Sequence, residues 1–126
     1  MSEFKEEWLE SVHKQRYERS RHLMDFHVAG FAYYEGLEVI DELTLGKPVQ
    51  LFVEHDNPHD PDAVVIYYQD YKLGDIPSNK NGLLSQLLYF GHSELFEARI
   101  QYVNKESHPE RQFRVVIKIK DKCFTK

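Results

Sequence analysis

The stretch that decides the fold of this chain reads Glu54-His55-Asp56-Asn57-Pro58-His59-Asp60-Pro61-Asp62-Ala63-Val64. It places two prolines and many turn-forming polar residues between two apolar segments, 49–53 and 63–68. These segments are rich in the β-branched and aromatic residues that favour strands. Asn57 and Asp60 can accept hydrogen bonds from nearby backbone N–H groups, and the prolines stiffen the loop. The stretch therefore predicts a rigid turn that joins two strands.

Outward from this turn, the apolar pattern predicts further short strands and one inserted helix. Residues 96–102 and 113–120 alternate apolar and polar side chains, which is typical of strands with one buried face. Residues 79–90 carry leucines at helical spacing, with Asn79 or Asn81 as a cap and Gly91 placed to end the helix. The predicted strands span residues 26–33, 49–53, 63–68, 71–76, 96–102 and 113–120.

These elements predict an α+β domain whose six strands form a small antiparallel barrel, closed or partly open. A closed barrel removes the exposed strand edges that would otherwise promote aggregation. We expect the 79–90 helix, which precedes the last two strands, to cover one end of the barrel. The expected core comprises Val49, Leu51, Val53, Ile66, Ile100, Val115 and Ile117.

The N-terminal residues predict a separate amphipathic helix over 3–22. Ser2 can cap it, and Phe4, Trp8 and Val12 recur on one face. We therefore expect three parts, which are the helix within residues 1–24, the barrel domain in 25–122 and a short tail in 123–126.

Size and composition restrict the class of protein. A length of 126 residues with 41% hydrophobic and 13% aromatic residues suits one β-rich domain. The N-terminus does not resemble a signal peptide and no segment is apolar enough to span a membrane, so we expect a cytoplasmic protein. A single cysteine, Cys123, excludes an intrachain disulfide and a cysteine-based zinc site.

Charge is distributed unevenly along the chain. The net charge is −5, which disfavours tight non-specific binding to nucleic acid because such binding requires phosphate neutralisation. Residues 99–126, however, carry eight basic and three acidic side chains. This segment forms either a local positive stripe or an ordinary solvated strand edge.

Three motifs together resemble the HIRAN domain. They are Val28-Ala29-Gly30-Phe31-Ala32-Tyr33-Tyr34-Glu35-Gly36, the stretch 54–64, and Leu73-Gly74-Asp75-Ile76-Pro77, in this order. The resemblance runs from about His27 to Lys120. HIRAN domains occur at the N-termini of some SWI/SNF-type translocases and alone in many bacterial proteins. The resemblance implies an OB-like or SH3-like barrel and binding of the 3′ end of single-stranded DNA.

The resemblance also implies roles for individual residues. Tyr33 would stack on a terminal base, and Asp60 would accept a hydrogen bond from the 3′-hydroxyl. Tyr34, Asn57 and His59 lie in the same motifs, and His59 replaces an aromatic residue that relatives can carry.

Two further positions bear on the implied ligand site. Ala32 stands where relatives can place a phosphate-binding arginine. Phe113 is a further candidate wall of the site, from the start of the last predicted strand.

Two other functions stay open at this point. A protein-interaction module would use the Phe4/Trp8/Val12 face or an exposed strand edge. A metal-dependent hydrolase or nuclease would use the acidic turn from Asp56 to Asp62, with His55, His59 and Asp60 as metal ligands. The chain shows no nucleophile motif and no phosphate-binding glycine loop, so we expect no catalysis of its own and no cofactor.

Overall fold

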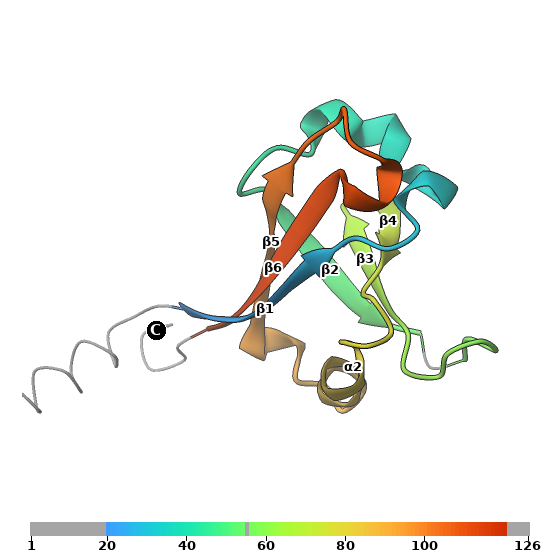
Figure 1. Ribbon diagram of the computed structural model, residues 1–126. Helices are drawn as coiled ribbons and strands as arrows, with labels where there is room; N and C mark the ends of the chain where they lie inside the picture. The colour runs from blue at the N-terminus through green and yellow to red at the C-terminus, as the bar shows by residue number, and fades with distance from the viewer. Residues whose placement is uncertain (1–19, 55, 121–126) are drawn as a thin grey trace, which may run out of the picture.

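The computed structural model describes residues 20–54 and 56–120, which form one antiparallel sheet with short helices at its two ends (Figure 1). Every predicted strand segment is present, although the first occupies different residues. The strands are β1 (Ser20–His27), β2 (Pro48–Val53), β3 (Val64–Tyr68), β4 (Tyr71–Asp75), β5 (Phe96–Val103) and β6 (Phe113–Lys120).

The sheet is six-stranded, in the order β1-β6-β5-β2-β3-β4, and every pairing is antiparallel. Its two edge strands approach each other where Ala29, just after β1, pairs with Asp75 at the end of β4. The two backbone hydrogen bonds of this bridge are both 2.9 Å long. Because one bridge joins the edges rather than a continuous ladder, the pairing does not form the fully closed barrel that was one of the expected forms.

Helical segments cover the two ends of the sheet. The helix α2 (Gly82–Tyr89) and the short η3 (Ser93–Leu95) lie at one end. The 3-10 segments η1 (Phe31–Tyr33), η2 (Glu35–Glu42) and η4 (Pro109–Arg111) gather at the other end (Figure 1). The predicted 79–90 helix is confirmed in position but is shorter, and Gly91 ends it with a φ of 88°.

The core lies inside the curved sheet and includes most of the expected residues. Ile66, Val115 and Ile117 have no exposed surface, and Val49 and Ile100 are also buried. Leu51 and Val53 are only half-buried, because each lines a surface groove that it shares with residues of α2.

Two sequence predictions near the N-terminus are wrong for the described residues. Ser20 to His22 belong to β1 and pair with the end of β6, so the predicted helix cannot extend to residue 22. Residues 31–33 form η1 instead of continuing the first strand, because Gly30 adopts a φ of 73° and turns the chain. The Phe4/Trp8/Val12 face and the tail 123–126 lie outside the described residues.

Candidate functional site

The turn between β2 and β3 is built around the side chain of Asn57. Its Oδ1 accepts hydrogen bonds from the backbone N–H groups of His59 at 2.8 Å and Asp60 at 3.2 Å. Its Nδ2 donates to Glu54 Oε1 at 2.9 Å. An asparagine that bonds backbone groups two and three residues ahead forms an Asx turn. The rigid turn predicted from the sequence is therefore present.

The Asp60 carboxylate is held on both sides. Asp60 Oδ2 accepts a hydrogen bond from Asn81 Nδ2 at 2.8 Å, and Oδ1 accepts one from the backbone N–H of Asp62 at 2.9 Å. Asn81 precedes α2 and is 3% exposed. The Asp62 carboxylate in turn accepts from the Ser85 hydroxyl of α2. The turn is thereby attached to the helix at two points.

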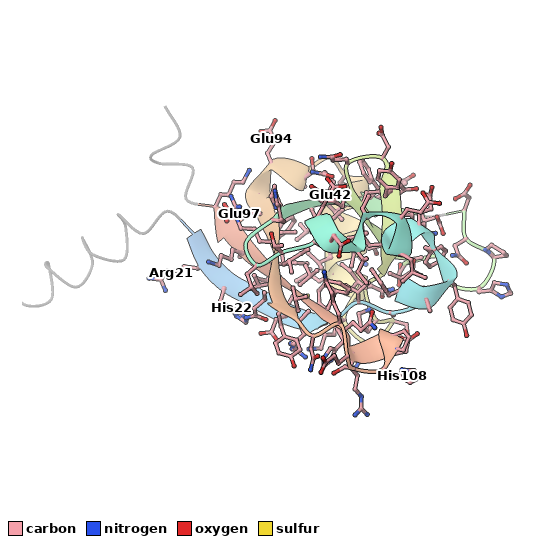
Figure 2. All side chains as sticks on the ribbon, turned by 90° about the horizontal axis from the view of Figure 1, so that it is seen from above. Arg21, His22, Glu42, Glu94, Glu97 and His108 are labelled. Carbon is pink, nitrogen blue, oxygen red and sulfur yellow. The ribbon has the colours of Figure 1, made fainter. Side chains whose placement is uncertain are left out.

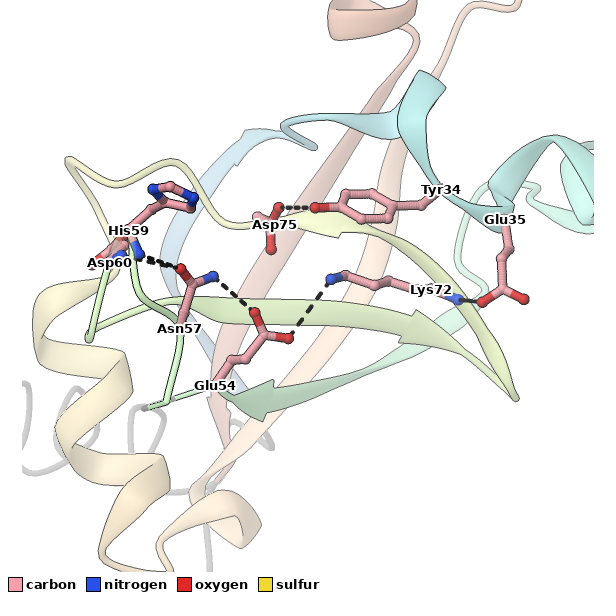
Figure 3. Close-up of polar contacts among 8 residues, drawn as sticks. All are labelled: Tyr34, Glu35, Glu54, Asn57, His59, Asp60, Lys72 and Asp75. Atoms are coloured by element: carbon pink, nitrogen blue, oxygen red, sulfur yellow. Dashed lines mark hydrogen bonds and ion pairs between the residues drawn. The ribbon is translucent and has the colours of Figure 1, made fainter.

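A second group of polar side chains lies next to the turn and comes from β4 and from the residues that directly follow η1 and β2 (Figure 3). The Tyr34 hydroxyl donates to Asp75 Oδ2 at 3.2 Å. Lys72 Nζ lies 4.1 Å from the centre of the Tyr34 ring and 3.7 Å from Glu54 Oε2. We call Tyr34, Asp75, Lys72 and Glu54 the Tyr34–Asp75 cluster. Because Glu54 also accepts from Asn57, the contacts run unbroken from Asp75 to the Asx turn.

The charges of this cluster influence one another. Burial raises the pKa of the Asp75 carboxyl, and the carboxylates of Glu54 and Asp60 raise it further, whereas Lys72 opposes the shift. Burial and Asp75 likewise raise the pKa of Tyr34, so its phenol stays neutral. Burial disfavours the charge of Lys72, but Glu54, Tyr34 and Asp75 together raise its pKa. The carboxylates of Asp75, Glu54 and Asp60 therefore influence one another beside one cation, Lys72. We call these three carboxylates the acidic wall.

Gly74 allows the two motifs that flank the site to come together. A Cβ at this position would lie 2.4 Å from the carbonyl oxygen of Ala29 and 2.6 Å from Val28 Cγ1. No side chain fits in that space, so glycine lets β4 pair with the segment after β1. The same pairing places Asp75 beside the Gly30 turn that leads into Tyr33 and Tyr34.

The candidate ligand residues differ in how accessible they are. Tyr33 is 82% exposed at the end of η1, and His59 is exposed at the tip of the turn. Tyr34, Asn57 and Asp60 are partly covered by the contacts described above. Phe113 is 2% exposed and packs against Phe31, with ring centres 4.7 Å apart. Its ring belongs to the core, so it is not available as a wall for a ligand.

Sequence reasoning missed Asp75, Lys72 and Asn81 as parts of the site. Asp75 lies within the Leu73–Pro77 motif, so its position in a recognised motif was an available signal. Lys72 and Asn81 carry no such signal, because their partners come from other strands and from the turn. In residues 20–54 and 56–120, no group of three or more His, Cys, Asp or Glu side chains could hold a metal ion, and His55 lies outside the described residues.

A family comparison decides the relationship that the three motifs suggested. The model of the HIRAN domain matches residues 22–120. The chain belongs to the HIRAN domain family. The match spans β1 to β6, so it includes the Gly30 turn, the Asx turn and the end of β4. The resemblance inferred from the sequence is thereby confirmed. HIRAN domains are known as DNA-binding modules.

Two solved structures have the same fold as this HIRAN domain. A protein from Lactobacillus plantarum aligns with a TM-score of 0.67 and 20% identity, covering 79% of this chain and 94% of its own. The HIRAN domain of human HLTF aligns with a TM-score of 0.56 and 18% identity, covering 82% of each chain. A comparison with curated protein sequences found no match. Within the part of the chain that the structure describes, no helix has the length and apolar character needed to span a membrane.

Proposed function

We propose that this HIRAN domain binds single-stranded DNA and recognises its 3′-hydroxyl end, without catalysing a reaction. The observation that carries the proposal is the half-buried Asp60 carboxylate, which Asn81 and the Asp62 amide hold in place. An ionised carboxylate has about four lone-pair positions. Two of them are used within the protein, so capacity remains for a hydroxyl donor such as the 3′ end of a strand.

The acidic surroundings of Asp60 favour a hydroxyl end over a phosphate end. Asp60 and Glu54 lie close enough to Asp75 to raise the pKa of its carboxyl, so several negative charges share this wall. A terminal phosphate would add like charge without supplying a donor to Asp60. The hydroxyl form would bind with a charge-assisted hydrogen bond instead.

Stacking supplies the second part of the proposed recognition. The Tyr33 ring is 82% exposed, which leaves its face accessible to a terminal base. Base stacking on an aromatic ring contributes about 1–3 kcal/mol and does not depend on the terminal group. His59 at the tip of the turn offers a further flat surface and, when protonated, a positive charge.

The test is a fluorescence anisotropy titration with matched oligonucleotides that end in a 3′-hydroxyl or a 3′-phosphate. We expect at least a tenfold preference for the hydroxyl end, because one charge-assisted hydrogen bond contributes about 1.5–3 kcal/mol. Asp60→Asn should remove the preference, whereas Tyr33→Ala should lower the affinity for both oligonucleotides equally. Tyr89→Ala, a change at another exposed tyrosine at the end of α2, serves as the control and should bind DNA like the wild type.

Thermal unfolding of each variant separates a loss of binding from a loss of folding. This matters for Asp60, because its carboxylate also binds buried Asn81. Equal affinity for the two ends at low salt, in a folded wild-type protein, would contradict 3′-hydroxyl recognition.

The proposed architecture behind this function is a partly open OB-like or SH3-like barrel. The observation that supports it is the Ala29–Asp75 bridge, which brings the edge strands β1 and β4 together at one point. In OB-folds, one strand face and the loops beside it bind oligonucleotides.

A protein-interaction module is the second candidate function. Tyr89 and Phe90 at the end of α2 are 55% and 71% exposed, and they line a groove with Val53 and Pro61. Exposed aromatic side chains beside a groove are typical of peptide-binding surfaces. The salt dependence of binding distinguishes the two candidate functions. Nucleic-acid binding weakens steeply as the salt concentration rises, whereas binding through apolar contacts does not.

A further inference from the structure

A strip of basic side chains follows the outer edge of β1 and the start of β6. Lys80 Nζ donates to the backbone oxygen of Asp25 at 3.0 Å. Arg114 lies beside His27, with 3.1 Å between Nη1 and Nδ1, and pairs with the Asp25 carboxylate. Arg111 is exposed at the end of η4, just before β6. We call Lys80, His27, Arg114 and Arg111 the basic strip.

The strip carries three permanently charged cations, Lys80, Arg114 and Arg111, against the carboxylates of Asp25 and Glu110. Asp25 is paired with Arg114, and the Glu110 carboxylate accepts the Gly30 N–H with both oxygens at 3.2 Å. The pKa of His27 is lowered by burial and then by the nearby charges of Arg114 and Arg111. His27 therefore adds little charge, and the attraction for an anion comes from the two guanidinium groups and from Lys80.

Each end of the strip adjoins the proposed DNA site. Lys80 is followed by Asn81, whose amide holds the Asp60 carboxylate. At the other end, η4 packs against η1, which carries the exposed Tyr33. Both views show η4 and η1 side by side, and Figure 2 labels His108 at the start of η4.

We infer that the basic strip binds the phosphates of the DNA strand leading away from the 3′ end, an inference that rests on the proposed function. The wall formed by Asp60, Glu54 and Asp75 repels phosphates, so the terminal hydroxyl can approach it but the backbone cannot follow. Lys80 and Arg111 attract the backbone to the opposite side of the same site. The strip thereby supplies the cations that Ala32 does not, and it orients the strand.

The test compares single-stranded DNA of increasing length, with a 3′-hydroxyl or a 3′-phosphate, on the full chain and on charge variants. We expect Lys80→Gln with Arg111→Gln to lower the affinity for a long 3′-hydroxyl oligonucleotide at least tenfold. The slope of log affinity against log salt should fall by about one for each phosphate that the variant no longer neutralises. The ratio of the affinities for the 3′-hydroxyl and 3′-phosphate oligonucleotides should not change, because Asp60 still binds the terminal hydroxyl.

Lys47→Gln is the matched control, since Lys47 is exposed before β2 and away from the strip. A dinucleotide should bind the double variant almost as well as it binds the wild type, because it carries few phosphates. If the wild type prefers the hydroxyl end but the double variant behaves like Lys47→Gln, the basic strip is not the backbone site. If the wild type does not distinguish the ends, the proposed function fails and this inference fails with it.

Discussion

The Asx turn and the Tyr34–Asp75 cluster lie next to each other but are built in different ways. In the Asx turn, Asn57 finds its partners within three residues along the chain. In the cluster, Tyr34 and Asp75 are separated by 41 positions, and Lys72 contacts both the Tyr34 ring and Glu54, which follows another strand. The first depends on local chemistry, whereas the second exists only because the sheet brings distant segments together.

The two regions also differ in what they contribute to the proposed function. The Asx turn positions the Asp60 carboxylate, whose oxygens have defined partners. This carboxylate is therefore suited to accept a hydrogen bond from a terminal hydroxyl. The cluster contains partly buried charges whose pKa values are shifted, so it responds to pH and to the packing of the strands. Mutations should therefore affect the two regions unequally.

The largest expected effect is on the strand pairing that assembles the cluster. Gly74→Ala would place a Cβ 2.4 Å from the Ala29 carbonyl oxygen. We expect the free energy of unfolding to fall by about 2–4 kcal/mol, because backbone must move to relieve the overlap. Urea denaturation measures this change. Gly82→Ala is the control, since a Cβ there has nothing within 4 Å, and it should leave stability unchanged or slightly raised.

Disruption of the Asx turn should have an intermediate effect. Asn57→Ala removes three hydrogen bonds, to Glu54, His59 and Asp60. We expect a loss of about 1–2 kcal/mol of stability, together with a smaller preference for the 3′-hydroxyl end, because the Asp60 backbone loses an anchor. Thermal unfolding and anisotropy measure the two quantities. Asn79→Ala, at an exposed position before α2, should change neither, and an equal loss there would contradict the role of Asn57.

The smallest expected effect is electrostatic and concerns Asp75. Its pKa is raised by burial, so the folded state binds the proton more tightly than the unfolded state does. The free energy of unfolding therefore falls as pH rises from about 3.8 through the raised pKa of the folded state. Asp75→Asn should abolish this contribution while changing stability at pH 7 by only about 0.5 kcal/mol.

Denaturation of the wild type and Asp75→Asn across this pH range measures the contribution as a difference. Other groups, such as Asp25, titrate in both proteins, so their contributions to the free energy of unfolding cancel in the difference. A stability difference between the two proteins that does not vary with pH would contradict the shifted pKa. The same variant should bind DNA somewhat more tightly, because the acidic wall loses one charge.

Local patterns in the sequence predict much of this structure. Alternation predicts β5 and β6, leucine spacing predicts α2, and the asparagine and prolines predict the turn. Each of these signals depends on residues within a few positions of one another, so the physical cause is contained in the segment itself. The motifs that resemble the HIRAN domain are of the same kind, because each is a short run of neighbouring residues.

Other features depend on contacts between distant segments and could not be predicted in this way. The first strand begins at Ser20, because the end of β6 offers it a pairing edge, although the preceding pattern favours a helix. Phe113 is part of the core, because Phe31 from the Gly30 turn packs on it.

The chain by itself determined a rigid acidic turn and a β-rich domain, since these follow from the preferences of neighbouring residues. Only the tertiary structure decided that Asp75 and Lys72 join the turn and that Lys80 and Arg111 adjoin the proposed DNA site. The reason is physical: charges interact through space, so their effect depends on which strands pair and not on their separation along the chain.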